Sequence, residues 1–186
     1  MKAPEPLTLT RGRVALEPWV ERHDADLLAA AQDDAIWTWM PALRPRTPSD
    51  MRQIRQTHPG QPWAVVVDGV AAGSTSYLEV ELEAEGLEIG WTWYRRELWA
   101  GDVNPTCKLL LLGYAFDDLG AGRVTLRTDG LNVRSQAAIR KLGCAYDGTL
   151  RHHRRRPDGS VRDSAFFSML AGEWPTARDR LLSRLS

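Results

Sequence analysis

The stretch Leu87-Glu88-Ile89-Gly90-Trp91-Thr92-Trp93-Tyr94 and the helix start Asn104-Pro105 that follows it decide the fold. Apolar residues recur at every second position from 87 to 93, which predicts a strand whose two faces differ. The predicted faces are Leu87, Ile89, Trp91 and Trp93 on one side and Glu88, Gly90, Thr92 and Tyr94 on the other. Asparagine followed by proline is typical of an N-cap and a first helical residue, so a helix is predicted from Asn104 to about Asp118.

A second strand and helix follow along the chain. Residues 123–128 predict a strand, Asp129-Gly130 predicts a turn, and Asn132 predicts the N-cap of a helix that ends at Gly143. Two such units in succession indicate a parallel pair of strands whose following helices begin at the same edge of the sheet. Ligands of open α/β sheets bind at that edge, so the two helix starts are the first candidates for a site.

Hairpins flank the two units on both sides. Residues 63–67 and 70–80 predict strands joined by Asp68-Gly69, a strong hairpin signal, and residues 145–156 and 161–170 predict a second pair. A short strand at 13–16 and helices at 25–31, from 49, and from 173 to 185 complete the pattern. We therefore expect an α/β protein with a mixed sheet. No repeat or linker interrupts it, so residues 1–186 predict a single domain, with residues 1–6 as a flexible tail.

Composition excludes several classes of protein. The chain has 186 residues with 24 Lys and Arg against 24 Asp and Glu, so it lacks the basic excess of a general nucleic-acid binder. Apolar runs such as residues 109–112 are too short to span a bilayer, and the first six residues lack the apolar core of a signal peptide. Two cysteines and four scattered histidines indicate neither a disulfide framework nor a metal site. We expect a cytoplasmic protein that binds no metal, no membrane and no nucleic acid.

The junction between Tyr94 and Asn104 carries the first chemical signal. Gly101 lets a ligand approach the backbone closely, and the N–H groups at the following helix start, with the positive end of the helix dipole, suit a phosphate. Most junctions of this kind bind nothing, so this one alone does not indicate a site. The second helix start provides further support for a phosphate-binding or ligand-binding site at this edge of the sheet. There Asn132 and Ser135 stand at the N-cap and N3 positions, where each is either a binding group or a structural cap.

Several short motifs together resemble those of the GNAT acyl-CoA N-acyltransferases. They are Glu88-Ile89-Gly90-Trp91, Trp99-Ala100-Gly101, Phe116, Arg123-Val124, Asn132-x-x-Ser135 and Lys141-Leu142-Gly143. The likeness continues through Asp147-Gly148-x-Leu150-Arg151, Arg162-Asp163 and Glu173-Trp174-Pro175. It covers residues 7–185 and is specific over residues 88–170. Within the superfamily the chain is most similar to the RimJ/RimL-like branch.

The resemblance implies a fold and a co-substrate. The fold would be α/β, with a splayed and mostly antiparallel mixed sheet of about seven strands flanked by helices. Acetyl-CoA would bind with its pantetheine between the strands at 87–94 and 123–129. The residues implied to contact it are Trp93, Tyr94, Ala100, Gly101, Asp102, Val103, Asn104, Asn132, Ser135 and Arg140.

The implied phosphate loop departs from the family pattern. The family usually reads Gln/Arg-x-x-Gly-x-Gly/Ala, whereas this chain reads Glu97-Leu98-Trp99-Ala100-Gly101-Asp102. The glycines are displaced and an acid lies near the phosphates. We expect Asp102 to point to solvent or to meet Arg95 or Arg96, which leaves the backbone amides of residues 101–104 to bind the phosphates.

The implied reaction is direct attack of a neutral amine on a thioester. It needs a base, donors for the developing oxyanion and an acid for the departing thiolate. Ser135 matches the hydroxyl that protonates the thiolate in the branch, and a backbone N–H of residues 91–93 would bind the oxyanion. Glu88 is the candidate base, although in an acidic stretch it could equally be a surface carboxylate. Candidate acceptor-binding residues are Trp37, Trp39, Trp91 and His152, and core packing is the alternative for the tryptophans.

The acceptor would be a small-molecule amine or the N-terminal amine of a protein or peptide, and the chain a monomer or homodimer. A catalytically silent acyl-CoA-binding or interaction module is the main alternative, because the phosphate loop is irregular. A nucleic-acid patch over residues 151–156 is weak against a net charge of zero. A hydrolase triad of Ser135, His152 or His153, and Asp163 lacks the Gly-x-Ser-x-Gly turn that exposes a nucleophilic serine.

Overall fold

The computed structural model describes residues 1–186 and contains one open mixed sheet of eight strands. The strands lie in the order β1-β2-β3-β4-β5-β6-β8-β7, and only β5 and β6 pair in parallel. Their bounds are Leu9–Arg11, Val14–Pro18, Gln61–Val67, Val70–Glu81, Gly86–Tyr94, Arg123–Asp129, Ala145–Arg155 and Val161–Leu170 for β1 to β8. The predicted α/β class and mixed sheet are confirmed, with β1 as a strand beyond the seven expected.

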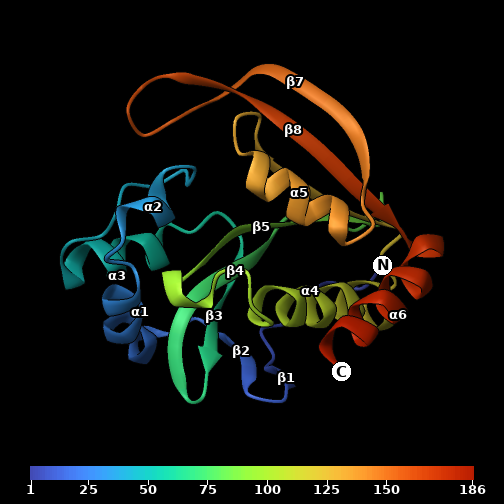
Figure 1. Cartoon of the computed structure of the whole chain (residues 1–186), viewed down its shortest axis with the longest axis horizontal. Coiled ribbons are helices and arrows are strands. Elements are labelled where there is room, and N and C mark those ends of the chain that lie inside the picture. The colour runs from blue at the N-terminus through green and yellow to red at the C-terminus, as the bar shows by residue number, and fades with distance from the viewer.

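Six α-helices flank the sheet (Figure 1). Their bounds are Asp24–Ala30, Asp34–Trp37, Pro48–Gln56, Val103–Gly113, Val133–Lys141 and Trp174–Leu185 for α1 to α6. Figure 1 shows α1, α2 and α3 grouped together, α4 packed along α6, and the long β7–β8 hairpin arching over α5. None of the helices combines the length and the apolar character that crossing a membrane requires.

Two hydrophobic cores lie on opposite faces of the sheet, as expected for a sheet with helices on both sides. The larger core joins α4, α5 and α6 to the sheet and includes Leu87 and Ile89 of β5. The smaller core joins α1, α2 and α3 to the other face and includes Trp37 and Trp93. Strand β5 therefore contributes side chains to both cores.

A bulge in β5 changes the predicted alternation of its side chains. Ser74 pairs with Trp93 and Ser76 pairs with Gly90, so Trp91 and Thr92 both lie opposite a single residue of β4. Trp91 has a φ of +49°, a left-handed conformation that is rare for a bulky residue and typical of strain at a functional position. The prediction that Trp91 and Trp93 share a face with Leu87 and Ile89 is wrong, because the extra residue reverses the phase of the strand.

The two helix starts differ from one another. At α5, Asn132 is the N-cap as predicted, and its Oδ1 accepts a hydrogen bond from the Ser135 backbone N–H at 3.0 Å. At α4 the predicted cap is displaced, because the helix begins at Val103 and Asn104 lies inside it. The Asn104 side chain instead accepts a hydrogen bond from the Tyr94 hydroxyl at 3.1 Å, which ties the helix start to the end of β5.

Residues 1–6, for which the sequence suggests a flexible tail, lie against the domain. The backbone N–H of Lys2 donates to the carbonyl of Leu119 at 2.8 Å, and that of Glu5 donates to the Tyr114 hydroxyl at 2.9 Å. Both partners follow α4, where the helix continues as a π-helical turn over Tyr114–Asp118. The first residues therefore cover the C-terminal end of α4.

Candidate active site

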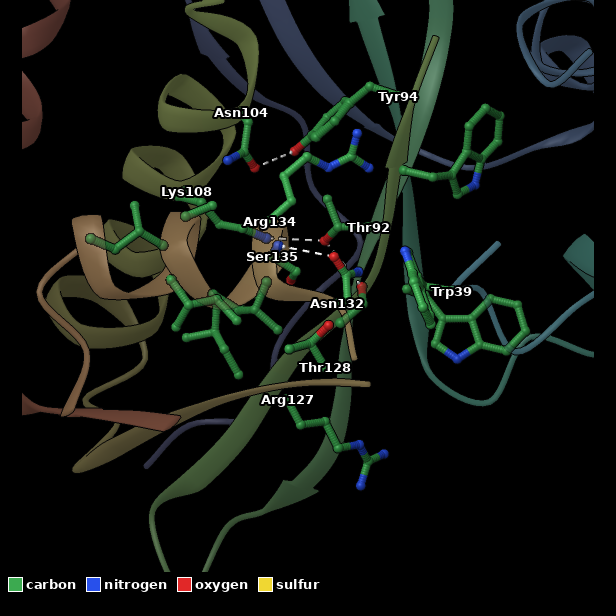
Figure 2. Close-up of a pocket in the computed structure, with 18 of the residues that line it drawn as sticks. Trp39, Thr92, Tyr94, Asn104, Lys108, Arg127, Thr128, Asn132, Arg134 and Ser135 are labelled. Carbon is green, nitrogen blue, oxygen red and sulfur yellow. Dashed lines mark hydrogen bonds between the residues drawn. The ribbon is translucent and has the colours of Figure 1, made fainter. Parts of the chain in front are cut away.

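The parallel strands β5 and β6 stay together for only three residue pairs and then separate. Gly86 to Glu88 pair with Arg123 to Thr125, and no pairing follows toward the carboxyl ends. A cavity of about 540 Å³ lies in this gap, lined by β5, β6, the first turns of α4 and one face of α5. Figure 2 shows the side chains of these elements converging on it. The separation of the two strands thus opens a cavity between them.

Glu88 lies where β5 and β6 part. Its side chain is buried, with 3% of the residue exposed, and its carboxylate lies 3.0 Å from Nε of Arg127 on β6. Burial raises the pKa of Glu88 to about 7, while the nearby Arg127 guanidinium acts in the opposite direction. A Cβ on residue 90 would lie 2.6 Å from the Glu88 carboxylate, so the glycine of Gly90 is what makes room for it. Glu88 is therefore a buried carboxylate able to exchange a proton near neutral pH.

Three arginines surround Glu88 on the cavity wall: Arg127 on β6, Arg154 on β7 and Arg162 on β8. Arg127 and Arg154 share the carboxylate of Glu79, at 2.8 Å and 3.2 Å. Arg162 has no ion-pair partner, and its buried Nε has no hydrogen-bond acceptor. The sequence analysis did not single out this cluster, because the strands that carry it lie far apart along the chain.

Lys108 of α4 is a second cation that the sequence analysis missed. It is buried and lines the cavity, and its Nζ donates to the Thr92 hydroxyl at 3.0 Å (Figure 2). Burial lowers the pKa of Lys108 to about 8. The available signal was a single lysine within the apolar helix that the sequence predicts. Lys108 and Thr92 join α4 to the bulged part of β5.

The loop before α4 takes an unusual backbone path. Ala100 has a φ of +62°, a left-handed conformation that normally favours glycine. Ala100 therefore adopts a backbone turn of the kind that glycines make in the family's phosphate loop. Asp102 is exposed to solvent, one of the two expected outcomes, and its ion-pair partner is Arg13 at 2.8 Å rather than Arg95 or Arg96. That pairing holds the pKa of Asp102 below its usual value and draws the carboxylate toward β2. The acidic side chain is therefore an exposed, ionised carboxylate that is paired with a cation.

Helix α5 forms the other wall with Asn132 and Ser135. Both residues line the cavity, as does Thr92 of β5 (Figure 2). The cap uses the Oδ1 of Asn132 and the backbone N–H of Ser135, while the Ser135 hydroxyl makes no hydrogen bond to protein. The guanidinium of Arg134 lies 3.6 Å from the ring centre of Trp99, a cation–π contact between the two helix starts.

The comparisons with known proteins agree with this geometry. A family model described as an acetyltransferase (GNAT) domain matches residues 13–145, which is most of the chain. The chain belongs to the GNAT acetyltransferase family. No protein of curated function shows significant sequence similarity to this acetyltransferase.

Solved structures show the same fold. A protein of T. thermophilus assigned as an acetyltransferase is 32% identical, with a TM-score of 0.89 over 99% of this chain and 100% of that one. RimJ of Mycobacterium smegmatis, solved with a CoA disulfide, is 20% identical, with a TM-score of 0.81 over 96% of this chain and 95% of that one. RimL, a ribosomal L7/L12 α-N-protein acetyltransferase solved with coenzyme A, is 14% identical, with a TM-score of 0.73 over 88% of this chain and 98% of that one. The two proteins that give the expected branch its name thus share this fold.

Not every predicted cofactor-binding residue of this acetyltransferase lines the cavity. Those on its wall are Trp93, Tyr94, Ala100, Gly101, Asn104, Asn132 and Ser135. Asp102 is paired with Arg13, and Val103 is fully buried in the larger core. Arg140 is exposed on α5, where its guanidinium stacks over the Phe167 ring at 4.9 Å. The predicted residues that meet in the gap therefore come from the end of β5, the loop before α4 and the first turns of α4 and α5.

The predicted acceptor residues divide in the same way. Trp39 and Trp91 line the cavity and are partly exposed. Trp37 lies instead in the smaller core, with its ring 5.4 Å from that of Trp93 and its indole N–H donating to the Ala31 carbonyl. His152 is exposed on β7, with its backbone N–H bound to Asp163, and does not reach the cavity. Trp37 and His152 are thus placed away from the site.

Proposed function

We propose that the protein transfers an acetyl group from acetyl-CoA to a primary amine by direct attack in a ternary complex. The observation that carries the proposal is the cavity between β5 and β6, which is lined by Glu88 from one side and Ser135 from the other. In the proposed reaction Glu88 would be the proton acceptor and Ser135 the proton donor. The family assignment supports acetyl transfer, and the residues below give the proposed roles.

The residues at the two helix starts fit coenzyme A. The first turn of α4 offers backbone N–H groups at the positive end of an eleven-residue helix, which suits a pyrophosphate. Asp102 would oppose a phosphate by its charge, but its ion pair with Arg13 removes that conflict. Asn104 and Asn132 place polar side chains along the path between the strands. When bound there, acetyl-CoA supplies the thioester that is the source of the acetyl group.

Glu88 would act as the base toward the acceptor. An amine attacks only in its neutral form, so a proton must leave the ammonium before or during the step. A carboxylate whose pKa lies at about 7 is partly ionised at neutral pH and accepts such a proton, directly or through a water. Arg127, at 3.0 Å, holds the carboxylate in place and lowers the penalty for its charge.

The bulge in β5 and the hydroxyl of Ser135 would stabilise the charges that develop. The bulge leaves Trp91 and Thr92 without one-to-one partners on β4, so a backbone N–H at these two residues is the proposed donor to the oxyanion. Ser135 has no competing hydrogen bond, so its O–H can donate to the departing thiolate and deliver a proton. The acetyl carbonyl and the sulfur would therefore meet donors on β5 and on α5, respectively.

The acceptor would enter on the side of Trp39 and Trp91. Both rings line the cavity, and the ring of His58 lies edge-on to Trp91 with their centres 4.7 Å apart. An aromatic wall with a buried carboxylate suits a primary amine on a small molecule or at the N-terminus of a peptide. The action of RimL on a protein N-terminus supports the peptide class by structural likeness alone.

Thiol release from acetyl-CoA with a panel of amines tests the proposal. The panel contains amino acids, polyamines and short peptides with free N-termini, and mass spectrometry identifies the acetylated product. We expect thiol release that depends on both acetyl-CoA and one class of amine. Binding of acetyl-CoA without turnover of any amine would favour the alternative of a silent acyl-CoA-binding module.

A further inference from the structure

Arg162 of β8 is a cation without a partner in the wall of the active-site cavity. It is half-buried, its Nε is shielded from solvent, and no acceptor lies within hydrogen-bond distance of that nitrogen. The nearby acid Asp129 is already bound through both oxygens to Arg156, at 2.8 Å and 3.1 Å. A buried donor of this kind normally carries a hydrogen bond, so its isolation indicates a missing ligand.

The surrounding charges make the position unfavourable for the fold alone. Arg154 lies directly opposite Arg162 in the antiparallel β7–β8 pair, where like charges destabilise a sheet. Arg127 also faces the same cavity, so three guanidinium groups meet the two carboxylates of Glu79 and Glu88. Glu79 binds Arg127 and Arg154, and Glu88 lies beside Arg127. One positive charge is left without compensation, and it is that of Arg162.

We infer that the acceptor amine carries a carboxylate, which pairs with Arg162 while the amine lies beside Glu88. This inference rests on the proposed function, because it names the class of acceptor for the same cavity. A guanidinium binds a carboxylate through two parallel N–H donors, which fixes the orientation of the acceptor as well as its position. The carboxylate is either the α-carboxylate of a free amino acid or an acidic side chain near the N-terminus of a peptide.

Two matched pairs of acceptors separate these sources. The first pair is L-phenylalanine and its amide, and the second is a tripeptide amide with Glu or Gln at its second position. For each acceptor, KM is measured in the wild type, in Arg162→Gln and in the control Arg151→Gln. Arg151 lies on the exposed face of β7 and does not line the cavity. Comparing variants with the same acceptor cancels the different basicities of the amines.

We expect Arg162→Gln to raise KM for a carboxylate-bearing acceptor by about 10- to 100-fold, the loss typical of one charge-assisted hydrogen-bond pair. The KM of the matched amide should change less than about threefold, and Arg151→Gln should change neither. The pair that responds identifies the source of the carboxylate. The melting temperature of Arg162→Gln should equal or exceed that of the wild type, because the substitution removes like-charge repulsion.

Two results would overturn the inference. Equal changes of KM for acid and amide in Arg162→Gln would show that the acceptor needs no carboxylate, while the proposed acetyl transfer would stand. If no amine is acetylated, the proposed function fails instead. Calorimetric titration of the Glu tripeptide into the protein with CoA then tests whether Arg162 binds a carboxylate. Binding that is lost in Arg162→Gln supports the site, and absence of binding in the wild type rejects it.

Discussion

The burial of Glu88 predicts a pH dependence for the proposed reaction. Its pKa is raised from 4.5 to about 7, chiefly by burial, so the ionised base forms only as the pH rises through neutrality. We expect kcat/KM to rise as the pH increases through about 7 and to level off above it, and we expect Glu88→Gln to lose this pH-dependent rise. General-base catalysis contributes about 10²- to 10⁴-fold, so the variant should lose that much in kcat. A variant with the wild-type pH profile would exclude Glu88 as the base.

The same shift gives Glu88 a measurable effect on stability. Between pH 4.5 and about 7 the folded protein holds a proton that the unfolded chain has released, so this residue makes stability fall as the pH rises. The penalty is complete above about pH 7. The change in unfolding free energy from below pH 4.5 to well above pH 7, measured by urea unfolding, should therefore be more positive for Glu88→Gln than for the wild type.

Ser135 permits a clean separation of catalysis from stability. The cap of α5 depends on the Asn132 side chain and the backbone N–H of Ser135, so the Ser135 hydroxyl is dispensable for the helix. We expect Ser135→Ala to reduce kcat about 100-fold or somewhat more, with little change in unfolding free energy. Asn132→Ala is the control for the cap and should destabilise the protein by about 1 kcal/mol. A Ser135→Ala variant that keeps more than half of the wild-type kcat would leave the residue without a catalytic role.

At the scale of elements, the segment around α2 places two tryptophans in different environments. Trp37 ends the helix and packs on Trp93 in the smaller core, whereas Trp39 follows the helix and lines the cavity. Trp37→Ala should destabilise the protein by about 3–5 kcal/mol, as expected for an aromatic residue removed from a core. Trp39→Ala should instead raise the acceptor KM with a smaller effect on stability.

Urea unfolding and acceptor kinetics on both variants test this distinction. The two substitutions remove the same side chain at positions two residues apart, so each serves as the control for the other. A folded Trp39→Ala protein with unchanged KM would place the acceptor away from this segment. Greater destabilisation by Trp39→Ala than by Trp37→Ala would contradict the assignment of Trp37 to the core.

At the scale of the whole molecule, a ligand between β5 and β6 would bridge the two halves of the sheet. Strands β1 to β5 lie on one side of the gap, and β6, β8 and β7 lie on the other. A ligand present at about 100 times its Kd stabilises a protein by about 2.7 kcal/mol, which corresponds to a rise in Tm of roughly 5–10 °C for a domain of this size. We expect acetyl-CoA to produce such a rise.

The variant Asn104→Asp provides the control for this prediction. It preserves the shape of the side chain but adds a negative charge in the first turn of α4, where we place the pyrophosphate. The rise in Tm should therefore be smaller in the variant than in the wild type. An unchanged Tm of the folded wild-type protein at millimolar acetyl-CoA would contradict binding at this gap.

The sequence alone was sufficient to predict most elements of the sheet, the cap of α5 at Asn132 and the family. These features depend on residues close together along the chain, such as a two-residue alternation, a hairpin turn or an asparagine before a helix. The cavity between the strands at 87–94 and 123–129 was also expected, through the family resemblance. Local signals therefore specified the two helix starts, and the family resemblance added the position of the cavity between the strands.

Only the tertiary structure decided the electrostatics of the site. The phase of β5 after Trp91 depends on how it pairs with β4, and the isolation of Arg162 depends on which strands bring Glu79 and Asp129 to other arginines. The burial of Glu88 and Lys108, which sets their pKa values, likewise comes from packing across the gap. Such pairings join residues distant in sequence, and a shift of one residue in register reverses every side chain, so no local pattern could determine them.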